Sequence, residues 1–212
     1  MSSTKSLFTT HLPPLSDRMR PRTISDFIGQ DHLVGKGKLV SRLVETQQLA
    51  SLIFWGPPGT GKTTLARILA HSLGAHFAEL SAVSSGVKEL REVIRSARAQ
   101  IELGIQTILF IDEIHRFSKS QQDALLHAVE DGTVYLIGAT TENPSFEVIS
   151  PLLSRCRILV LKALTEPALN TILDHALRED IVFRSRSSDL PEVSRKLLTQ
   201  SSGGDARKML NT

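Results

Sequence analysis

Residues 56–64 read Gly56-Pro57-Pro58-Gly59-Thr60-Gly61-Lys62-Thr63-Thr64, and they fit the phosphate-loop pattern G-x-x-x-x-G-K-[ST]. The apolar run Leu52–Trp55 before them is typical of a buried strand, and Lys62–Leu73 has the pattern of a helix. Between a strand and a helix, glycines allow backbone N–H groups to converge on phosphate oxygens. We therefore expect Lys62 to reach the β- and γ-phosphates of a nucleotide and the Thr63 hydroxyl to bind Mg²⁺.

Apolar runs and helical patterns alternate along the first three quarters of the chain. Strands are expected at Leu52–Trp55, Phe77–Leu80, Thr107–Ile111, Val134–Ala139 and Arg157–Leu161. The helices among them are expected at Lys62–Leu73, Val87–Leu103 and Ser120–Val129. This alternation predicts an α/β fold, in which helices cover both faces of a parallel sheet.

The pattern changes after Leu164, where only helices are expected. They are Glu166–Arg178, Pro191–Gln200 and one that begins near Asp205. We therefore expect three parts: a flexible N-terminal segment at 1–16, a nucleotide-binding α/β domain at 17–163, and a small helical lid at 164–212.

Composition restricts the class of protein only loosely. The 212 residues carry a net charge of +3 with a pI near 9.2, which permits a nucleic-acid partner without requiring one. Cys156 is the single cysteine, so no intramolecular disulfide can form, as suits a reducing cytoplasm. No apolar run is long enough for a membrane span, and Met1–Leu15 lacks the apolar core of a secretory signal. We expect a cytoplasmic protein without membrane contact.

Two carboxylates follow the apolar run Ile108–Ile111. Asp112 and Glu113 would stand at the carboxyl edge of a buried parallel strand, where such sheets bind their ligands. Asp112 can bind Mg²⁺, and Glu113 can orient and polarise the water that attacks a γ-phosphate. Asp112-Glu113-Ile114-His115 also fits a DExH helicase motif, but that class needs a second motor domain, for which 212 residues leave no room. We expect His115 to orient these carboxylates rather than to bind metal.

Three shorter patterns carry candidate polar groups. Thr140 and Thr141 end an apolar strand, where a hydroxyl can sense the γ-phosphate or hold the attacking water. Arg155 lies between a helix and a strand, where it could stabilise transition-state charge in a neighbouring subunit. Asp205 can cap a helix whose first turn contains Arg207, a position that favours a cation only beside a bound anion.

In this order the motifs resemble those of AAA+ ATPases of the clamp-loader group. The longer strings Pro14–Pro21, Phe110–Asp123 and Gly138–Phe146 are similar to those of the RarA family, which includes the eukaryotic Werner-helicase-interacting ATPase. The resemblance extends from about Leu12 to Thr212. It implies a P-loop NTPase fold with a five-stranded sheet in the order 5-1-4-3-2.

The resemblance also implies roles for single residues. Residues 56–64 would be the Walker A motif, and Asp112 with Glu113 the Walker B motif. Sensor 1 would be Thr141, with Thr140 as the alternative. The remaining roles are a trans-acting arginine finger at Arg155, sensor 2 at Arg207, and an adenine contact at Ile28 and Gly29.

For the whole protein, the resemblance implies ATP and Mg²⁺ as cofactors and action at stalled replication forks. DNA forks, ends and gaps, single-stranded DNA-binding protein and the replication machinery would be partners, with nucleoid association in a bacterium. Members of the family form tetramers, largely through a C-terminal domain. They continue well past the sensor 2 helix, so this chain is expected to be an N-terminal portion with a partial lid and without that domain.

A basic stripe lies on the predicted helix Val87–Leu103. Lys88, Arg91, Arg95 and Arg98 recur at helical spacing and could track DNA phosphates. The competing interpretation is a solvated face with a local Glu92–Arg95 pair. No aromatic residue interleaves with the stripe, so base stacking is not indicated.

The sequence favours a DNA-dependent, Mg²⁺-dependent ATPase for fork maintenance, recombination and repair. A clamp-loader or branch-migration subunit is the second hypothesis, because it would use the same chemistry. The third is a nucleotide-binding scaffold without turnover.

Overall fold

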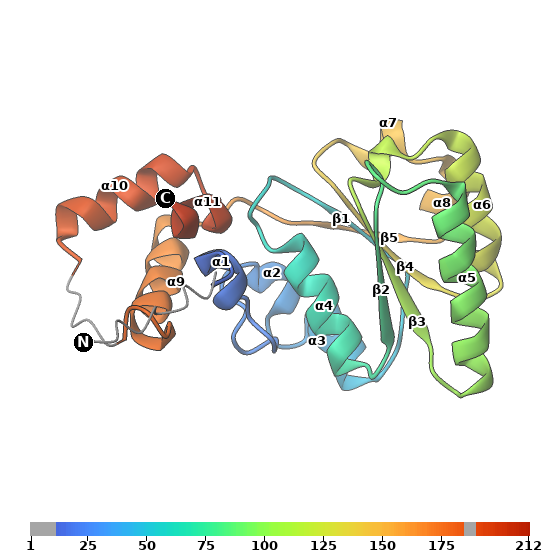
Figure 1. Cartoon of the computed structure of the whole chain (residues 1–212), viewed down its shortest axis with the longest axis horizontal. Coiled ribbons are helices and arrows are strands. Elements are labelled where there is room, and N and C mark those ends of the chain that lie inside the picture. Colours follow the sequence, from blue (N-terminus) through green and yellow to red (C-terminus); the bar gives the residue numbers. More distant parts are fainter. Residues whose placement is uncertain (1–11, 185–189) are drawn as a thin grey trace, which may run out of the picture.

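A five-stranded sheet forms the centre of the molecule in the computed structural model, which describes residues 12–184 and 190–212 (Figure 1). Its strands are β1 (Leu52–Trp55), β2 (His76–Ser81), β3 (Thr107–Asp112), β4 (Tyr135–Thr140) and β5 (Arg157–Val160). They lie in the order β2-β3-β4-β1-β5, and every pairing is parallel. The predicted parallel sheet and its order are confirmed.

Helices cover both faces of the sheet, as predicted. On one side lie α3 (Leu39–Glu45) and α4 (Lys62–Ser72), and on the other lie α5 (Val87–Glu102), α6 (Lys119–Glu130) and α8 (Ser150–Leu153) (Figure 1). Each side has its own apolar core. In β1, Leu52 and Phe54 join the first core while Ile53 joins the second. Strands buried on both faces need continuous apolar runs, which is why the sequence pattern identified them.

Residues after Leu164 form the helical lid. Its helices are α9 (Glu166–Glu179), α10 (Glu192–Ser202) and α11 (Ala206–Asn211). Leu164, Leu169, Leu173 and Met209 form a separate apolar core. The remaining elements are short: α1 (Leu15–Arg18), α2 (Asp31–Val34), the 3-10 turn η1 (Ile114–Arg116) and α7 (Pro144–Glu147). No helix within the described ranges is both long and apolar enough to cross a bilayer.

Helix α1 lies against the lid. The Arg18 guanidinium donates two hydrogen bonds to the Asp180 carboxylate, at 2.7 and 3.0 Å, just after α9 ends. Ser16 and Asn211 exchange two further hydrogen bonds with each other. The domain boundary expected between residues 16 and 17 therefore falls inside α1. This helix contacts α11, which lies at the far end of the chain. Of the expected flexible segment, residues 1–11 lie outside the described residues.

Candidate nucleotide-binding site

The phosphate loop connects β1 to α4 at the carboxyl edge of the sheet. Gly61 caps α4 with φ +97°, and a Cβ there would lie 2.7 Å from the Phe27 ring. Gly59 has φ +68°, and a Cβ there would lie 1.8 Å from the Asp205 carboxylate. These glycines are required by their backbone conformation and also by side chains that arrive from distant segments.

Lys62 lies beneath this loop. Its Nζ donates to the carbonyl oxygens of Gly56 at 2.7 Å and Pro57 at 2.8 Å, and the residue is only 8% exposed. Burial lowers the pKa of Lys62, because the charged ammonium loses hydration, while the nearby Asp112 and Glu113 carboxylates act in the opposite direction. The loop lysine and the carboxylates of β3 thus belong to one electrostatic site.

The carboxylates end β3 as predicted. Asp112 is the last residue of the strand, and its backbone oxygen accepts from Ala82 N at 3.1 Å. Glu113 follows with φ +55° and ψ 45°, a left-handed conformation that non-glycine residues rarely adopt. This conformation breaks the strand and starts η1, so the Glu113 side chain leaves the sheet at its carboxyl edge.

His115 lies between Glu113 and Thr140. Its Nε2 lies 3.3 Å from Glu113 Oε2, and its Nδ1 lies 3.0 Å from Thr140 Oγ. Thr140 ends β4 and is fully buried, whereas Thr141 is exposed beyond the strand. Of the two candidate threonines, Thr140 is the one that the structure connects to the carboxylates.

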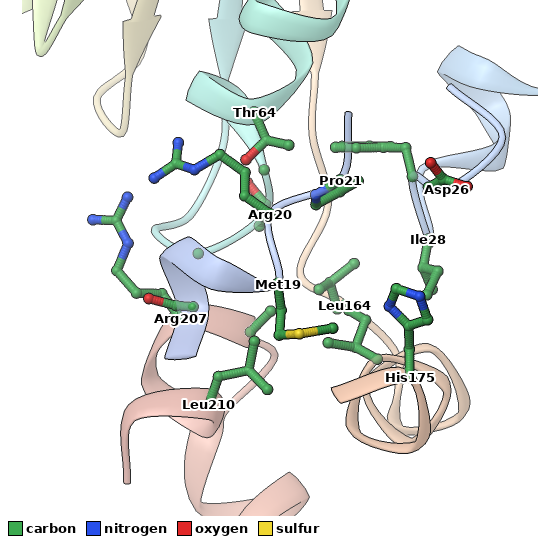
Figure 2. Close-up of a pocket in the computed structure, with 17 residues that line it drawn as sticks. Met19, Arg20, Pro21, Asp26, Ile28, Thr64, Leu164, His175, Arg207 and Leu210 are labelled. Carbon is green, nitrogen blue, oxygen red and sulfur yellow. The ribbon is translucent and has the colours of Figure 1, made fainter. Parts of the chain in front are cut away.

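A pocket opens between the phosphate loop, the N-terminal segment and the lid (Figure 2). Gly59, Thr60, Gly61 and Thr64 line it from the loop side. Its apolar part includes Met19, Ile28, Leu164, Ile172 and Leu210, and its polar rim includes Arg20, Asp26, His175 and Arg207. Figure 2 shows these side chains arriving from three separate segments. Gly29 lines an adjoining cavity with Gln30 and Lys162 instead. Apolar walls with a polar rim beside a phosphate loop suit a nucleoside.

The lid touches the phosphate loop directly. Ala206 N donates to Gly59 O at 3.3 Å, and Asp205 caps α11 by accepting from Lys208 N at 2.8 Å. The cap was predicted, but its contact with Gly59 was not. Arg207 follows in the first turn and lines the pocket, so the structure brings it to the site.

Arg155 lies elsewhere, at the amino edge of the sheet. It precedes β5, and Arg157 N bonds Ser51 O, which precedes β1, at 3.0 Å. The phosphate loop leaves the opposite end of β1, so Arg155 cannot contact the nucleotide of its own subunit. Its guanidinium pairs with Glu130 at 2.5 Å and donates to Pro151 O at 2.7 Å.

The basic stripe is solvent-exposed along α5. Lys88, Arg91, Arg95 and Arg98 all lie on the surface, beside α6 on the same face of the sheet (Figure 1). No ion pair involves any of the four among residues 12–184 and 190–212, so the Glu92–Arg95 pair of the competing interpretation is not formed there.

The donors at the carboxyl edge fit Mg²⁺. Thr63 offers a hydroxyl in the first turn of α4, and Asp112 offers a carboxylate at the end of β3. Mg²⁺ prefers oxygen ligands and is usually bound by one or two carboxylates together with substrate phosphates. The donor set is therefore the one that a magnesium-nucleotide complex needs.

Comparison with known proteins agrees with this geometry. Residues 52–164 match the model of the ATPase family associated with various cellular activities (AAA). The chain therefore belongs to the AAA family of ATPases.

Within that family it is similar to replication-associated recombination protein A of Escherichia coli K12, with 49% identity over 200 residues. That match covers 94% of this chain and 45% of the relative, so the chain spans about half the length of that protein. ATPase WRNIP1 of Dictyostelium discoideum is 48% identical over 198 residues, which cover 93% of this chain and 23% of that protein. The solved RuvB Holliday junction branch migration motor of Thermotoga maritima superposes with a TM-score of 0.72. It is 28% identical, and the match covers 91% of this chain and 63% of that one.

Several residues of the site have no local sequence signal. Phe27 packs on Gly61, Met19 and His175 line the pocket, and Glu130 pairs with Arg155. Gln122 is buried and hydrogen-bonds Phe117 O, Glu147 O and Ile149 N, which fixes the segment before Arg155.

Proposed function

We propose that this chain binds ATP with Mg²⁺ at the phosphate loop and hydrolyses it to ADP and phosphate. The observation that carries the proposal is the convergence of Lys62, Asp112 and Glu113 at one edge of the sheet. A buried lysine beside two carboxylates matches the needs of phosphoryl transfer, which depends on positioning and charge stabilisation.

In this proposal each group has a separate task. The loop N–H groups and Lys62 would hold the β- and γ-phosphates, while Thr63 and Asp112 would hold Mg²⁺, which would neutralise developing charge. Glu113 orients the attacking water in line with the leaving ADP. Arg207 stabilises charge from the lid, and Thr140 or Thr141 senses the γ-phosphate. Ile28, from the segment before α2, contacts the base, whereas Gly29 lines the adjoining cavity.

A complete site would require a second subunit. Arg155 faces away from the phosphate loop of its own chain, so we propose that it serves a neighbour as an arginine finger in a homo-oligomer, a tetramer in the full-length protein. The similarity to replication-associated recombination protein A supports a role in replication-fork maintenance, recombination and repair, with DNA and single-stranded DNA-binding protein as partners. The exposed α5 stripe would contact DNA phosphates.

A branch-migration motor is the second candidate, favoured by the likeness to RuvB. It has the same ATP site and differs in its task on DNA. Comparing the stimulation of turnover by forked DNA and by four-way junctions distinguishes them: a preference for four-way junctions would favour the motor.

The experiment that tests hydrolysis pairs two variants. Glu113→Gln keeps the size of the side chain but cannot polarise water, so it should bind ATP normally and lose turnover. Lys62→Ala should lose ATP binding itself, because a buried phosphate contact disappears. ATP binding and phosphate release are measured with and without forked DNA. Equal turnover in wild type and Glu113→Gln would exclude Glu113 as the group that activates water. ATP binding without turnover in the wild type would leave only a nucleotide-binding scaffold.

A further inference from the structure

The His115 imidazole connects the ends of two neighbouring strands. It lies between Glu113, directly after β3, and Thr140, the last residue of β4, at 3.3 and 3.0 Å. Only 13% of the His115 side chain is exposed, and Thr140 is fully buried. Because water has little access to the His115 imidazole, its two partners determine how the ring is oriented.

The partners determine the tautomer. An ionised carboxylate only accepts hydrogen bonds, so the proton of a neutral His115 belongs on Nε2, facing Glu113. Nδ1 then accepts from the Thr140 hydroxyl. The Thr140 oxygen in turn accepts from Glu142 N at 3.0 Å, while the other acceptor for its proton, Glu142 O, is farther away at 3.2 Å. One chain of polar contacts therefore runs from the Glu142 amide through Thr140 and His115 to the Glu113 carboxylate, where Nε2 and Oε2 lie 3.3 Å apart.

The intervening turn holds this geometry. Ile114 is fully buried, and a Cβ on Gly138 of β4 would lie 2.8 Å from its Cδ1. Because β4 has no side chain at that point, η1 approaches the strand closely. The left-handed backbone of Glu113 is retained by this packing.

We propose that His115 is a positioning residue for hydrolysis, which orients the Glu113 carboxylate according to the position of the β4 end. With Oε2 held beside His115 Nε2, the other oxygen of Glu113 can accept from the attacking water. The inference rests on the proposed ATPase function and deepens it. It assigns to Thr140 a role in the orientation of Glu113, through His115.

The segment that follows β4 could change the orientation of Glu113. Residues 141–149 lead from β4 to α8, and buried Gln122 binds this segment at Glu147 O and Ile149 N. A displacement there would move Thr140 through the hydrogen bond from Glu142 N, and His115 would carry it to Glu113. Contacts made by the exposed part of this segment would thus adjust hydrolysis without touching the nucleotide.

Kinetics of three variants test the proposal under conditions where the wild type turns over ATP. His115→Ala should lower kcat about tenfold, the effect of one hydrogen bond to a charged group, and leave KM for ATP unchanged. His115→Gln should recover part of kcat, because its amide N–H can donate to Glu113 while its oxygen accepts from Thr140. Thr140→Val should lower kcat, and combining it with His115→Ala should add no further loss.

Three kinetic outcomes would overturn the proposal: equal losses in His115→Ala and His115→Gln, additive losses in the double variant, or a KM change as large as the kcat change. A purely structural role for His115 predicts the first of these.

Imidazole ¹⁵N spectra of the chain provide a readout that is independent of activity. The wild type should show the Nε2–H tautomer of His115, and Thr140→Val should shift the Nδ1 resonance. An Nδ1–H tautomer, or an Nδ1 resonance indifferent to Thr140→Val, would exclude the relay. If the wild type does not hydrolyse ATP, the proposed function fails, and these spectra still decide whether the relay exists.

Discussion

At the scale of single residues, the phosphate loop depends on contacts with distant segments. Gly61 touches Phe27 and Gly59 touches Asp205, so the loop receives one support from before β1 and another from the lid. The glycine pattern alone indicates that the backbone needs a positive φ at these positions. The contacts add that even the Cβ of alanine would overlap a neighbouring side chain.

Replacing Gly61 by Ala should destabilise the protein and weaken nucleotide binding. A left-handed φ costs alanine roughly 1–2 kcal/mol, and the new Cβ would also displace the Phe27 ring. Gly37→Ala is a matched control, because Gly37 has φ +72° with nothing within 4 Å of the added Cβ. Chemical denaturation and nucleotide titration compare the two. The same loss of stability in both, with unchanged nucleotide affinity in Gly61→Ala, would contradict the contact argument.

At the scale of elements, α1 and the lid pack together although they lie at opposite ends of the chain. Arg18 and Asp180 are 162 positions apart and form a bidentate ion pair. Met19, Arg20 and Pro21 follow α1 directly and line the pocket. One wall of the nucleoside pocket is therefore attached to the lid, so a movement of the lid would carry that wall with it.

Asp180→Asn should destabilise the protein in a pH-dependent manner. The hydrogen bond from Arg18 lowers the pKa of Asp180 in the folded state below its ordinary value. The ionised pair therefore contributes its full stability above the unfolded pKa, near 4, and loses it as pH falls through the folded pKa. The difference in melting temperature between wild type and Asp180→Asn should stay constant from pH 7 to pH 5 and shrink below about pH 4. A difference in melting temperature that grows on acidification would mean that folding does not lower the pKa of Asp180.

At the scale of the whole molecule, the proposed catalytic groups lie at both edges of the sheet. Lys62 and Glu113 lie at the carboxyl edge, and Arg155 lies at the amino edge. If Arg155 serves a neighbouring subunit as proposed, one chain carries both halves of a site but cannot combine its own two halves. Hydrolysis should then depend on assembly.

Arg155→Ala should bind nucleotide as the wild type does and lose turnover at concentrations where the wild type is active. Mixing it with Lys62→Ala tests the division directly. The Lys62→Ala subunit still offers an intact Arg155, while the Arg155→Ala subunit still binds ATP, so mixed assemblies should regain turnover. Phosphate release is measured as the ratio of the two variants is changed. Loss of nucleotide binding in Arg155→Ala would place the arginine at its own site instead.

The strands, the phosphate loop and the Asp112–Glu113 pair were predictable from the chain alone. Each is a local pattern: an apolar run, a glycine spacing, or an acid at the end of a strand. The bounds of α4, α5, α6, α9 and α10 were predicted to within a residue or two, whereas the shorter helices α1, α2, α3, α7 and α8 were not predicted. For α6 the start was missed by one position, because the Ser118–Gln121 capping box begins the helix at Lys119.

The pairings across the sheet and between the lid and the body could not be predicted in this way. His115 meets Thr140, Gln122 meets Ile149, and Arg18 meets Asp180 across separations of 25 to 162 positions. Such contacts depend on how strands and helices pack in three dimensions, and no short-range spacing records them. Local chemistry along the chain therefore determined which groups are available, while packing determined which of them act together.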